Sequence, residues 1–359
     1  MKRVLVGLSG GVDSAVSAAL LMQEGHEVEA AFMHNWHTDP YAHCESSQDY
    51  ESACRVADHL DIPLHSIDFA SEYFSEVFEP FLDALAQNLT PNPDVLCNKQ
   101  VKFNHFLTYA QKAGFDYIAT GHYADIHPET FELYQPVDQR KDQTYFLHQL
   151  TRAQLKHTQF PLAHLDKKQV KKLAYDLCLP NHSRAESMGI CFIGANHFSS
   201  FIRQYLLDQP GDIVTLKGEV VGQHQGLHHY TIGQRKGLGI GGLAFKKTDA
   251  WYVAEKKALS NELIVVQSST HHALYDDTIY CKDPHWIGDP PEMPLKCYAR
   301  VRHGQPLTPC TLVKTDESFN VYFESPQRAI APGQYIVFYQ SKCCLGGSMI
   351  LGGIKNQQQ

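Results

Sequence analysis

Residues 4–14 read VLVGLSGGVDS, a short apolar run that leads into a loop of glycine and serine. The run Val4–Leu8 predicts a buried strand, and Ser14–Glu24, which stops before Gly25, predicts the helix that follows. Glycine allows the backbone to approach an anion closely, and the first turn of a helix offers unpaired N–H groups and a favourable dipole. The stretch therefore predicts a phosphate-binding loop between a strand and a helix.

The alternation of strand and helix continues through the first 200 residues. Further strands are predicted at Val28–Met33, Leu64–Phe69 and Tyr117–Thr120, and further helices at Asp49–Leu60, Ser71–Gln87 and about Asn98–Ala113. Repeated units of this kind predict an α/β layer with a Rossmann-like parallel sheet. In such sheets ligands bind at the carboxyl ends of the strands, so the active site is expected there.

The pattern changes at about residue 205 to glycine-rich segments with short alternating runs. These runs are Trp251–Ala254, Leu263–Gln267, Cys297–Val301, Thr311–Val313, Val321–Phe323 and Tyr335–Tyr339. Short strands between turns are typical of small barrels or sandwiches. We therefore expect a nucleotide-binding domain at 1–204, a small β-rich middle domain at 205–272 and a C-terminal β-barrel at 273–359.

Composition and charge exclude several classes of protein. Hydrophobic residues make up 43% and charged residues 19% of the 359, which excludes a disordered chain. No uncharged apolar stretch is long enough to span a membrane, so we expect a cytoplasmic protein that is not exported and has no membrane partner. The net charge is −8, but residues 140–172 carry 8 Lys and Arg against 2 Asp and Glu. That basic segment suits either phosphates or a solvated helix face.

The ten cysteines suggest a reducing compartment with free thiols. No CxxC occurs and the spacings fit neither a zinc ribbon nor a ferredoxin, so no resident metal site is expected. Cys97 is expected at the start of a helix, where the dipole favours the thiolate. Cys191 lies in an apolar stretch, where a small buried hydrophobe and a reactive thiol are both open readings.

The loop Gly7–Ser14 lacks the GK[ST] ending of a Walker A motif, so it is not a P-loop NTPase. It resembles the SGGVDS signature of the pyrophosphate-loop ATP-using enzymes. That resemblance implies ATP bound with Mg²⁺ on Asp13, because a hard cation prefers carboxylate and phosphate oxygens. The implied ATP contacts are Gly7, Leu8, Ser9, Gly10, Gly11, Val12, Asp13 and Ser14 of the loop, with Met33 and Gly121 near the adenosine.

Over nearly its full length the chain also resembles the tRNA-specific 2-thiouridylase family. The matching stretches are Gly7–Ser14, Phe32-Met33, Thr90–Lys99 (TPNPDVLCNK), Tyr117–Ala124 (YIATGHYA), Lys141–Leu147 (KDQTYFL), Gly189–Gly194, Tyr230–Gly242 (YTIGQRKGLGIGG) and Pro326–Tyr339. The resemblance implies ATP-dependent thiolation of carbon 2 of the wobble uridine in the anticodon stem-loop of tRNA.

The family pattern also implies roles for individual residues. Cys191 would carry the sulfur as a persulfide delivered by a sulfur-relay protein, Cys97 would release it, and Asp94 would act as general acid or base. Asn92, Pro93 and Asp94 would contact the flipped base. Further tRNA contacts are implied for His122, Lys141, Asp142, Gln143, Arg302, His303 and Gln334.

The sequence departs from the family pattern at two places. Arg302-His303 stands where Arg-Tyr is common, and Arg184-Ala185-Glu186-Ser187 stands where many members have Lys-x-Ser. The first departure puts aromatic stacking at position 303 in question. The second puts a cationic partner for Cys191 in question.

Two other functions remain open from the sequence. One is another pyrophosphate-loop ligase or synthetase that adenylates a small molecule and needs no cysteine. The other is a non-catalytic RNA-binding module with a vestigial loop. Cys191→Ser separates sulfur transfer from the first, and pyrophosphate release in the presence of tRNA separates an enzyme from the second.

Overall fold

A computed structural model describes residues 1–36, 45–185, 189–190, 193–194, 198–240, 249–316 and 318–354. The α-helices are α1 Val12–Gln23, α2 Glu45–Leu60, α3 Ala70–Tyr73, α4 Glu79–Ala86, α5 Pro93–Leu96, α6 Phe106–Lys112, α7 Thr144–Leu147, α8 Arg152–Leu155, α9 Lys167–Asp176 and α10 Phe198–Ile202. Two π-helical segments, η1 Phe74–Phe78 and η2 Cys97–His105, and two 3₁₀ turns, η3 Leu227–His229 and η4 His272–Leu274, complete the helical elements of these ranges.

The strands fall into three main sheets. Those of the first half are β1 Arg3–Gly7, β2 Glu27–His34, β3 Leu64–Asp68, β4 Tyr117–Ala119, β5 Asp125–Ile126, β6 Leu133–Tyr134, β7 Thr158–Gln159, β8 Gly189–Ile190 and β9 Ile193–Gly194. Those of the second half are β10 Gly211–Thr215, β11 Val220–His224, β12 Trp251–Lys257, β13 Glu262–Gln267, β14 Tyr275–Cys281, β15 His285–Trp286, β16 Leu295–Arg300, β17 Thr308–Lys314, β18 Phe319–Arg328, β19 Tyr335–Gln340 and β20 Cys343–Ile354.

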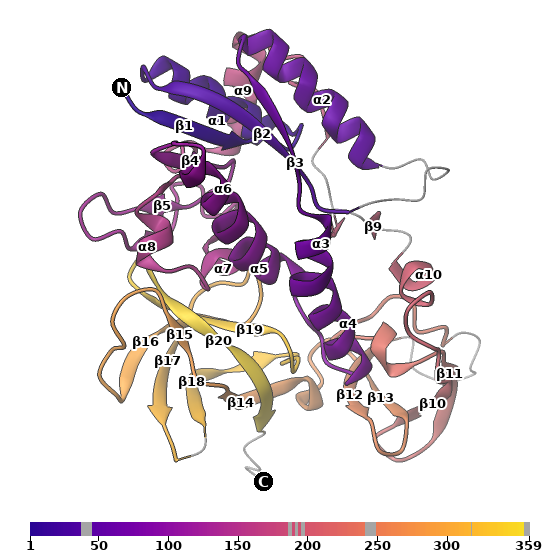
Figure 1. Ribbon diagram of the computed structural model, residues 1–359. Coiled ribbons are helices and arrows are strands. Elements are labelled where there is room, and N and C mark those ends of the chain that lie inside the picture. The colour runs from indigo at the N-terminus through magenta and orange to yellow at the C-terminus, as the bar shows by residue number, and fades with distance from the viewer. Residues whose placement is uncertain are drawn as a thin grey trace.

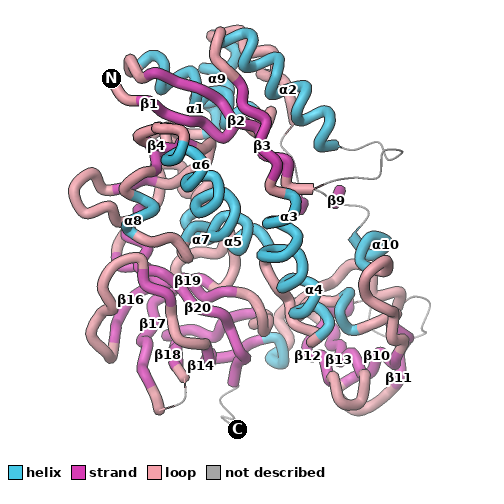
Figure 2. The backbone as a smooth tube through the Cα atoms, in the orientation of Figure 1, coloured by secondary structure: helices cyan, strands magenta, loops and turns pink. Residues whose placement is uncertain are grey.

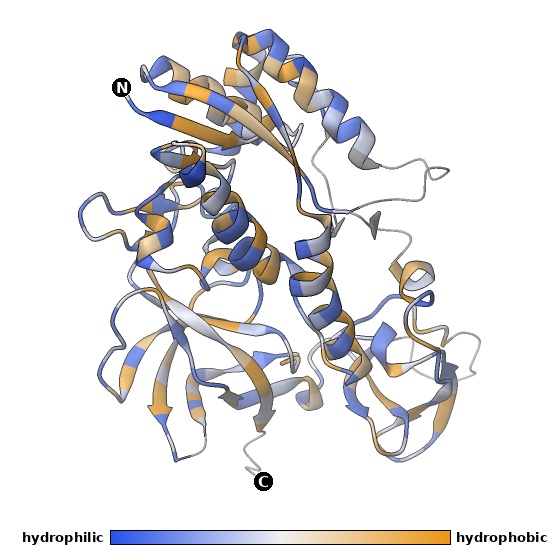
Figure 3. Cartoon of the chain, in the orientation of Figure 1, coloured by the Kyte–Doolittle hydropathy of each residue, from blue (hydrophilic) through white to orange (hydrophobic). Residues whose placement is uncertain are grey.

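The first sheet is parallel, in the order β3-β2-β1-β4-β7. Successive residues of β1 are buried on opposite faces: Leu5 packs in the cluster that contains Phe106 of α6, and Val4 packs in the cluster that contains Leu21 of α1. Helices therefore cover both faces, which is why the strand is apolar throughout rather than alternating. Figure 3 shows the apolar strands between more polar helix surfaces. The predicted Rossmann-like layer is confirmed.

The segment that carries Cys97 forms one continuous helix from α5 through η2 to α6. The expected start near Asn98 was wrong, because the helix begins at Pro93 and Cys97 lies beyond its first four residues. Asn92 caps this helix, its side chain accepting a hydrogen bond from the Asp94 N–H at 3.2 Å, and proline suits the first helical position. The dipole argument for Cys97 is weakened, because the effect falls off within the first turn.

The second half of the chain is built from β structure, as Figure 2 shows. A small sheet has the order β11-β10-β13-β12, and its inner side chains include Ile213, Val253 and Val265. The C-terminal strands run in the order β14-β18-β17-β16-β19-β20, and β14 pairs again with β20, which closes the barrel. The middle β domain and the C-terminal barrel are thereby confirmed as architectures.

One hairpin links the two halves. Strands β5 and β6 come from the first half of the chain, yet β6 pairs with β20 at Tyr134 and Cys343. Figure 1 shows α7 and α8 between the parallel sheet and the barrel strands. The boundaries at 204/205 and 272/273 stay a prediction. Within the described ranges, no helix has the length and apolar character needed to cross a bilayer.

Candidate active site at the carboxyl edge of the parallel sheet

The loop of residues 7–14 lies between β1 and α1, as the sequence predicts. Gly10 has a φ of +77°, and a Cβ there would meet the Asp49 carbonyl oxygen at 2.3 Å, so only glycine fits. The Ser14 hydroxyl accepts from the Ser9 N–H at 3.2 Å and donates to the Gly11 carbonyl at 3.0 Å. These bonds hold the loop compact at the N-terminus of α1, where first-turn N–H groups lack helical acceptors.

Three side chains hold the Gly10 carbonyl. Ser52 donates to it at 2.8 Å, Asn181 at 2.9 Å and Arg184 at 3.2 Å. Arg184 also forms an ion pair with Asp49. Because these donors occupy the carbonyl oxygen, the Gly10–Gly11 peptide is held in one orientation, and its own N–H donates to the Ser9 hydroxyl at 3.4 Å. The N–H groups of the first turn of α1 are the ones placed to meet an anion. Ser52, Asn181 and Arg184 also line a cavity of about 510 Å³ next to the loop.

Asp13, on the first turn of α1, is already engaged with a cation. Both of its carboxylate oxygens lie near the Lys167 ammonium, at 2.7 and 2.8 Å, and Oδ1 accepts from the Tyr123 hydroxyl at 3.0 Å. The side chain of Lys167 is 13% exposed and that of Asp13 is 30% exposed. The Lys167 charge therefore lies beside the loop rather than on an outer RNA-facing helix surface.

The predicted adenosine neighbours lie on the strands beside β1. A Cβ on Gly121, just after β4, would meet the Ser14 nitrogen at 2.7 Å, so this glycine packs directly against the start of α1. The Met33 side chain on β2 reaches within 3.4 Å of the corresponding point at Gly7. Both predicted residues are thus at the same edge of the sheet as the loop.

Asp94 and Cys97 share the start of the 93–112 helix. Cys97 is buried, and η2 begins at it; π-helical turns are frequent at functional sites. Burial raises the pKa of Asp94, while the nearby Lys102 and His303 charges act in the opposite direction. A carboxyl group with a raised pKa suits a general acid or base.

His122 lies between the two parts of the site. Its ring packs against Phe103 and Phe160, with centroids 5.7 and 6.1 Å away, and Nδ1 hydrogen-bonds the Thr120 hydroxyl at 2.7 Å. Burial, with a smaller contribution from Lys102, lowers the pKa of His122 well below its ordinary value. The imidazole is therefore neutral at physiological pH.

Three predicted tRNA contacts in the barrel reach back into the protein. The Gln334 amide donates to the Thr90 carbonyl at 2.8 Å, just before Asn92 and Pro93. His303 packs on Phe146 with ring centroids 4.6 Å apart. Arg302 donates to the carbonyl of Ile232 at 3.0 Å and also to that of Ala329. These residues join the barrel to the first half of the chain and to the middle domain.

The three residues Lys141, Asp142 and Gln143 lie in different environments. Asp142 is buried and accepts from Arg300 at 2.9 Å and Gln135 at 2.6 Å, so its carboxylate faces inward. Gln143 accepts from the Tyr123 N–H at 2.8 Å, and Lys141 is partly exposed. A direct tRNA contact is open to Lys141 and Gln143 but has no support in the position of Asp142.

Cys191, the predicted persulfide carrier, lies outside the described residues, as does Cys44. The predicted approach of Cys97 and Cys191 is therefore untested. Ser52, Asn181, Tyr123 and Lys167 were missed as site residues. Of these four, only Lys167 could have been noticed in the sequence. A lysine in the first turn of a helix is unfavourable next to the positive end of the helix dipole, which indicates that an acidic partner elsewhere in the fold stabilises it.

The chain was compared with known protein families. Residues 2–195 match a family described as the tRNA methyl transferase HUP domain, residues 199–267 its PRC-barrel domain, and residues 276–350 the aminomethyltransferase beta-barrel domain.

Two similar proteins are both named tRNA-specific 2-thiouridylase MnmA. That of Pseudomonas savastanoi pv. phaseolicola is 47% identical over 98% of this chain and 94% of its own length. That of Legionella pneumophila (strain Lens) is 46% identical over 97% of this chain and 98% of its own length. Among solved structures, U34-tRNA thiolase NcsA from Methanococcus maripaludis covers 56% of this chain and 63% of its own, with 19% identity and a TM-score of 0.35, too low to support an argument.

Proposed function

The chain belongs to the tRNA-specific 2-thiouridylase family, and from this premise we propose that it thiolates carbon 2 of the wobble uridine in tRNA at the expense of ATP. The matched family description speaks of methyl transfer. The relatives' name is the better guide, because they are 46–47% identical over almost the whole chain.

The observation that carries the proposal is the Gly10 loop between β1 and α1. Its carbonyl is held by Ser52, Asn181 and Arg184, next to the first-turn N–H groups of α1 that are placed to meet the phosphates of ATP. Met33 and Gly121 lie at the same edge of the sheet and suit the nucleoside.

Asp13 offers the hard carboxylate oxygens that Mg²⁺ prefers, next to the proposed phosphate site. Its present partner is Lys167, at 2.7 Å. We therefore propose that Asp13 holds Mg²⁺ when ATP is bound and that Lys167 then turns toward the phosphates. Mg²⁺ would supply charge neutralisation, and Lys167 would add to it.

The chemistry begins with attack of the uracil oxygen on the α-phosphorus, which releases pyrophosphate and leaves AMP on that oxygen. The outer sulfur of a Cys191 persulfide, delivered by a sulfur-relay protein, then attacks carbon 2 and AMP departs. Cys97 then attacks Cys191 Sγ and breaks its bond to the transferred sulfur, which stays on carbon 2 as the sulfur of 2-thiouridine. A Cys97–Cys191 disulfide forms, and two electrons from external thiols restore both cysteines. Asp94, with its raised pKa, would transfer the proton at the base.

A test measures two products separately: pyrophosphate release and 2-thiouridine in the tRNA after nucleoside digestion. Cys191→Ser should retain tRNA-dependent pyrophosphate release and lose 2-thiouridine. Cys97→Ser should lose 2-thiouridine as well, whereas Cys178→Ser, an exposed free cysteine, should behave as the wild type. Full thiolation by Cys191→Ser would refute the sulfur-transfer mechanism, and no pyrophosphate release from the wild type with tRNA would refute adenylation.

A further inference from the structure

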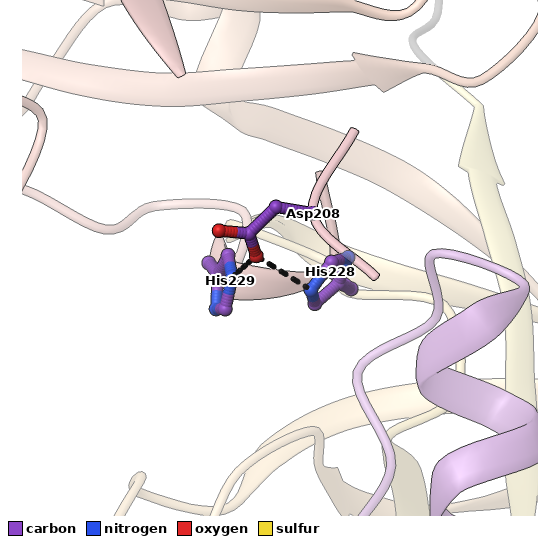
Figure 4. Close-up of side chains that lie close together, drawn as sticks. All are labelled: Asp208, His228 and His229. Atoms are coloured by element: carbon purple, nitrogen blue, oxygen red, sulfur yellow. Dashed lines mark hydrogen bonds and ion pairs between the residues drawn. The ribbon is translucent and has the colours of Figure 1, made fainter. Parts of the chain in front are cut away.

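Two histidines and an aspartate meet in the middle domain, away from the phosphate loop. His228 and His229 are adjacent in η3, and Asp208 lies in the segment between α10 and β10 (Figure 4). Asp208 Oδ1 is 2.7 Å from His229 Nε2 and 3.8 Å from His228 Nε2. One ligand atom from each residue lies within 4.8 Å of the others. Among the described residues, this is the group of three His, Cys, Asp or Glu side chains that lie close enough together to hold a metal ion.

The cluster is buried and incompletely satisfied. The side chain of His228 is 8% exposed and that of His229 is 7% exposed. Among the described residues, His228 Nε2, the ring atom that lies nearest Asp208 Oδ1, has no hydrogen-bond partner. A buried polar atom without a partner is unfavourable, and it calls for an explanation such as an ion. His228 Nε2 points toward the Asp208 carboxylate in Figure 4, so its lone pair faces the centre of the cluster.

We propose that Asp208, His228 and His229 bind a divalent transition-metal ion, with Zn²⁺ as the natural occupant. Imidazole is a good ligand for Zn²⁺, Cu²⁺ and Ni²⁺, and three protein ligands with one further position is a common zinc arrangement. The side chain of Asp208 is 24% exposed, which leaves room for water as the fourth ligand.

Two of the three distances between ligand atoms fit an ion after small movements, and the third, between the two histidine nitrogens, lies within 4.8 Å. Metal–ligand bonds of about 2.0–2.1 Å place tetrahedral ligands roughly 3.3 Å apart. The 2.7 Å pair would lengthen and the 3.8 Å pair would shorten, each by about half an ångström. Arg203 donates to Asp208 Oδ2 at 2.8 Å, which leaves Oδ1 as the single ligand atom and orients the carboxylate from behind.

The charges around the cluster select the class of ion. Arg203 and Lys256 lie within electrostatic reach of His228. Mg²⁺ and Ca²⁺ are held by several anionic oxygens, so nearby positive charge weakens their binding. The same charge matters less for an ion that forms strong bonds to imidazole.

The position of the site indicates a structural role. Asp208 precedes β10, and the two histidines follow β11, which is the antiparallel partner of β10. Because Gly211 lies opposite His224, the start of β10 and the end of β11 are at the same end of the strand pair, and an ion there would hold that end together. Binding to the folded state alone would raise the melting temperature, Tm, in proportion to the logarithm of metal concentration.

The test uses the full chain after chelator treatment and removal of the chelator. Co²⁺ titration followed by visible absorption, and displacement by Zn²⁺, should show one ion per chain. Asp208→Asn and His228→Gln should each weaken binding about tenfold or more and abolish the rise in Tm with Zn²⁺. The control is His272→Gln, in another adjacent histidine pair whose ring centroids are 4.4 Å apart but which is not part of the three-ligand group.

Three results would overturn the proposal. One is equal metal binding by the wild type and all three variants; another is no stoichiometric binding by the wild type. The third is a strong thiolate-to-Co²⁺ absorption band, which would assign the ion to cysteines. If His228→Gln does not fold, Asp208→Asn and the Tm of chelated wild type give the same decision. None of these measurements depends on thiolation activity, so this inference and the proposed function fail separately. The sequence expectation of no metal site rested on cysteine spacing and did not weigh this group.

Discussion

Single residues set the shape of the phosphate loop. Gly10 and Gly25 both have positive φ, +77° and +82°, but their surroundings differ. A Cβ at Gly10 would collide with the Asp49 carbonyl, whereas at Gly25 nothing lies within 4 Å among the described residues. A substitution at Gly25 therefore shows the cost of left-handed backbone alone, and the same substitution at Gly10 adds the cost of the collision with Asp49.

We expect Gly25→Ala to lower the free energy of unfolding by about 1–2 kcal/mol, the cost of left-handed backbone, and to leave ATP binding unchanged. Gly10→Ala should cost about 2–5 kcal/mol, because overpacking adds to the same strain, and should weaken ATP binding. Urea unfolding and nucleotide titration check both. Equal effects of the two substitutions would show that the contact with Asp49 does not matter.

The burial of Asp94 lowers the stability of the protein at neutral pH. Its folded-state pKa is raised, so the ionised carboxylate is penalised on folding, and the wild type gains stability as pH falls through that raised pKa toward the ordinary value. Asp94→Asn should therefore be at least as stable as the wild type at pH 7, and this advantage should fade as pH falls through that window. It should also lose thiolation.

The pKa of Asp116 is shifted in the opposite direction from that of Asp94, because the Arg3 backbone N–H and Lys2 lower it. Its stabilising effect is present above the ordinary carboxyl pKa and is lost as pH falls through the lowered value. Asp116→Asn should thus lower Tm at pH 7, and the loss should shrink in acid. Tm of the Asp94→Asn and Asp116→Asn variants, measured from pH 3 to 7, tests both expectations. Parallel curves of Tm against pH for the two variants would contradict the opposite pKa shifts of Asp94 and Asp116.

At the level of elements, helices bring cations to the edge of the parallel sheet. Helix α9 begins at Lys167, and the Asp166 side chain caps it through Gln169. The cap determines where the helix starts, so the first residue points its ammonium at Asp13 on α1. Two helix N-termini are thereby coupled at the proposed phosphate site.

Lys167→Met should raise the KM for ATP in pyrophosphate release by roughly 10- to 100-fold, because a charge-assisted hydrogen bond contributes about 1.5–3 kcal/mol. Lys168→Met, at the next and exposed position of α9, should leave that KM within about twofold, because an exposed lysine interacts weakly with a site it does not face. An unchanged KM in Lys167→Met would show that the ion pair with Asp13 is structural only.

Across the whole molecule, the barrel and the first half of the chain share one buried ion pair. Arg300 of β16 donates to Asp142 at 2.9 Å, and their side chains are 6% and 1% exposed. Arg152 instead pairs with Glu132 near the surface, with side chains 40% and 31% exposed.

Arg300→Met should destabilise the protein by about 3–5 kcal/mol, since it leaves the Asp142 carboxylate buried without its cation. Arg152→Met should cost about 0–1 kcal/mol. The double variant Arg300→Met with Asp142→Asn should recover part of the loss. Denaturant unfolding measures all three, and a small effect of Arg300→Met would mean that Gln135 and Thr144 alone stabilise the carboxylate.

The order of strands and helices, the parallel layer, the barrel and the position of the glycine loop between β1 and α1 could be predicted from the sequence, because each rests on local periodicity, glycine and capping. That this loop binds phosphate stays a prediction. Contacts between distant positions were not. Lys167 and Asp13 are 154 residues apart, and Gln334 and Thr90 are 244 apart. Hydrogen bonds depend on where folding places two backbones within a few ångströms, and no local pattern encodes that distance. The Asp208, His228 and His229 cluster likewise emerged only in three dimensions. The start of the Cys97 helix was misplaced for another reason, because Asn92 and Pro93 do carry a local capping signal that the prediction did not use.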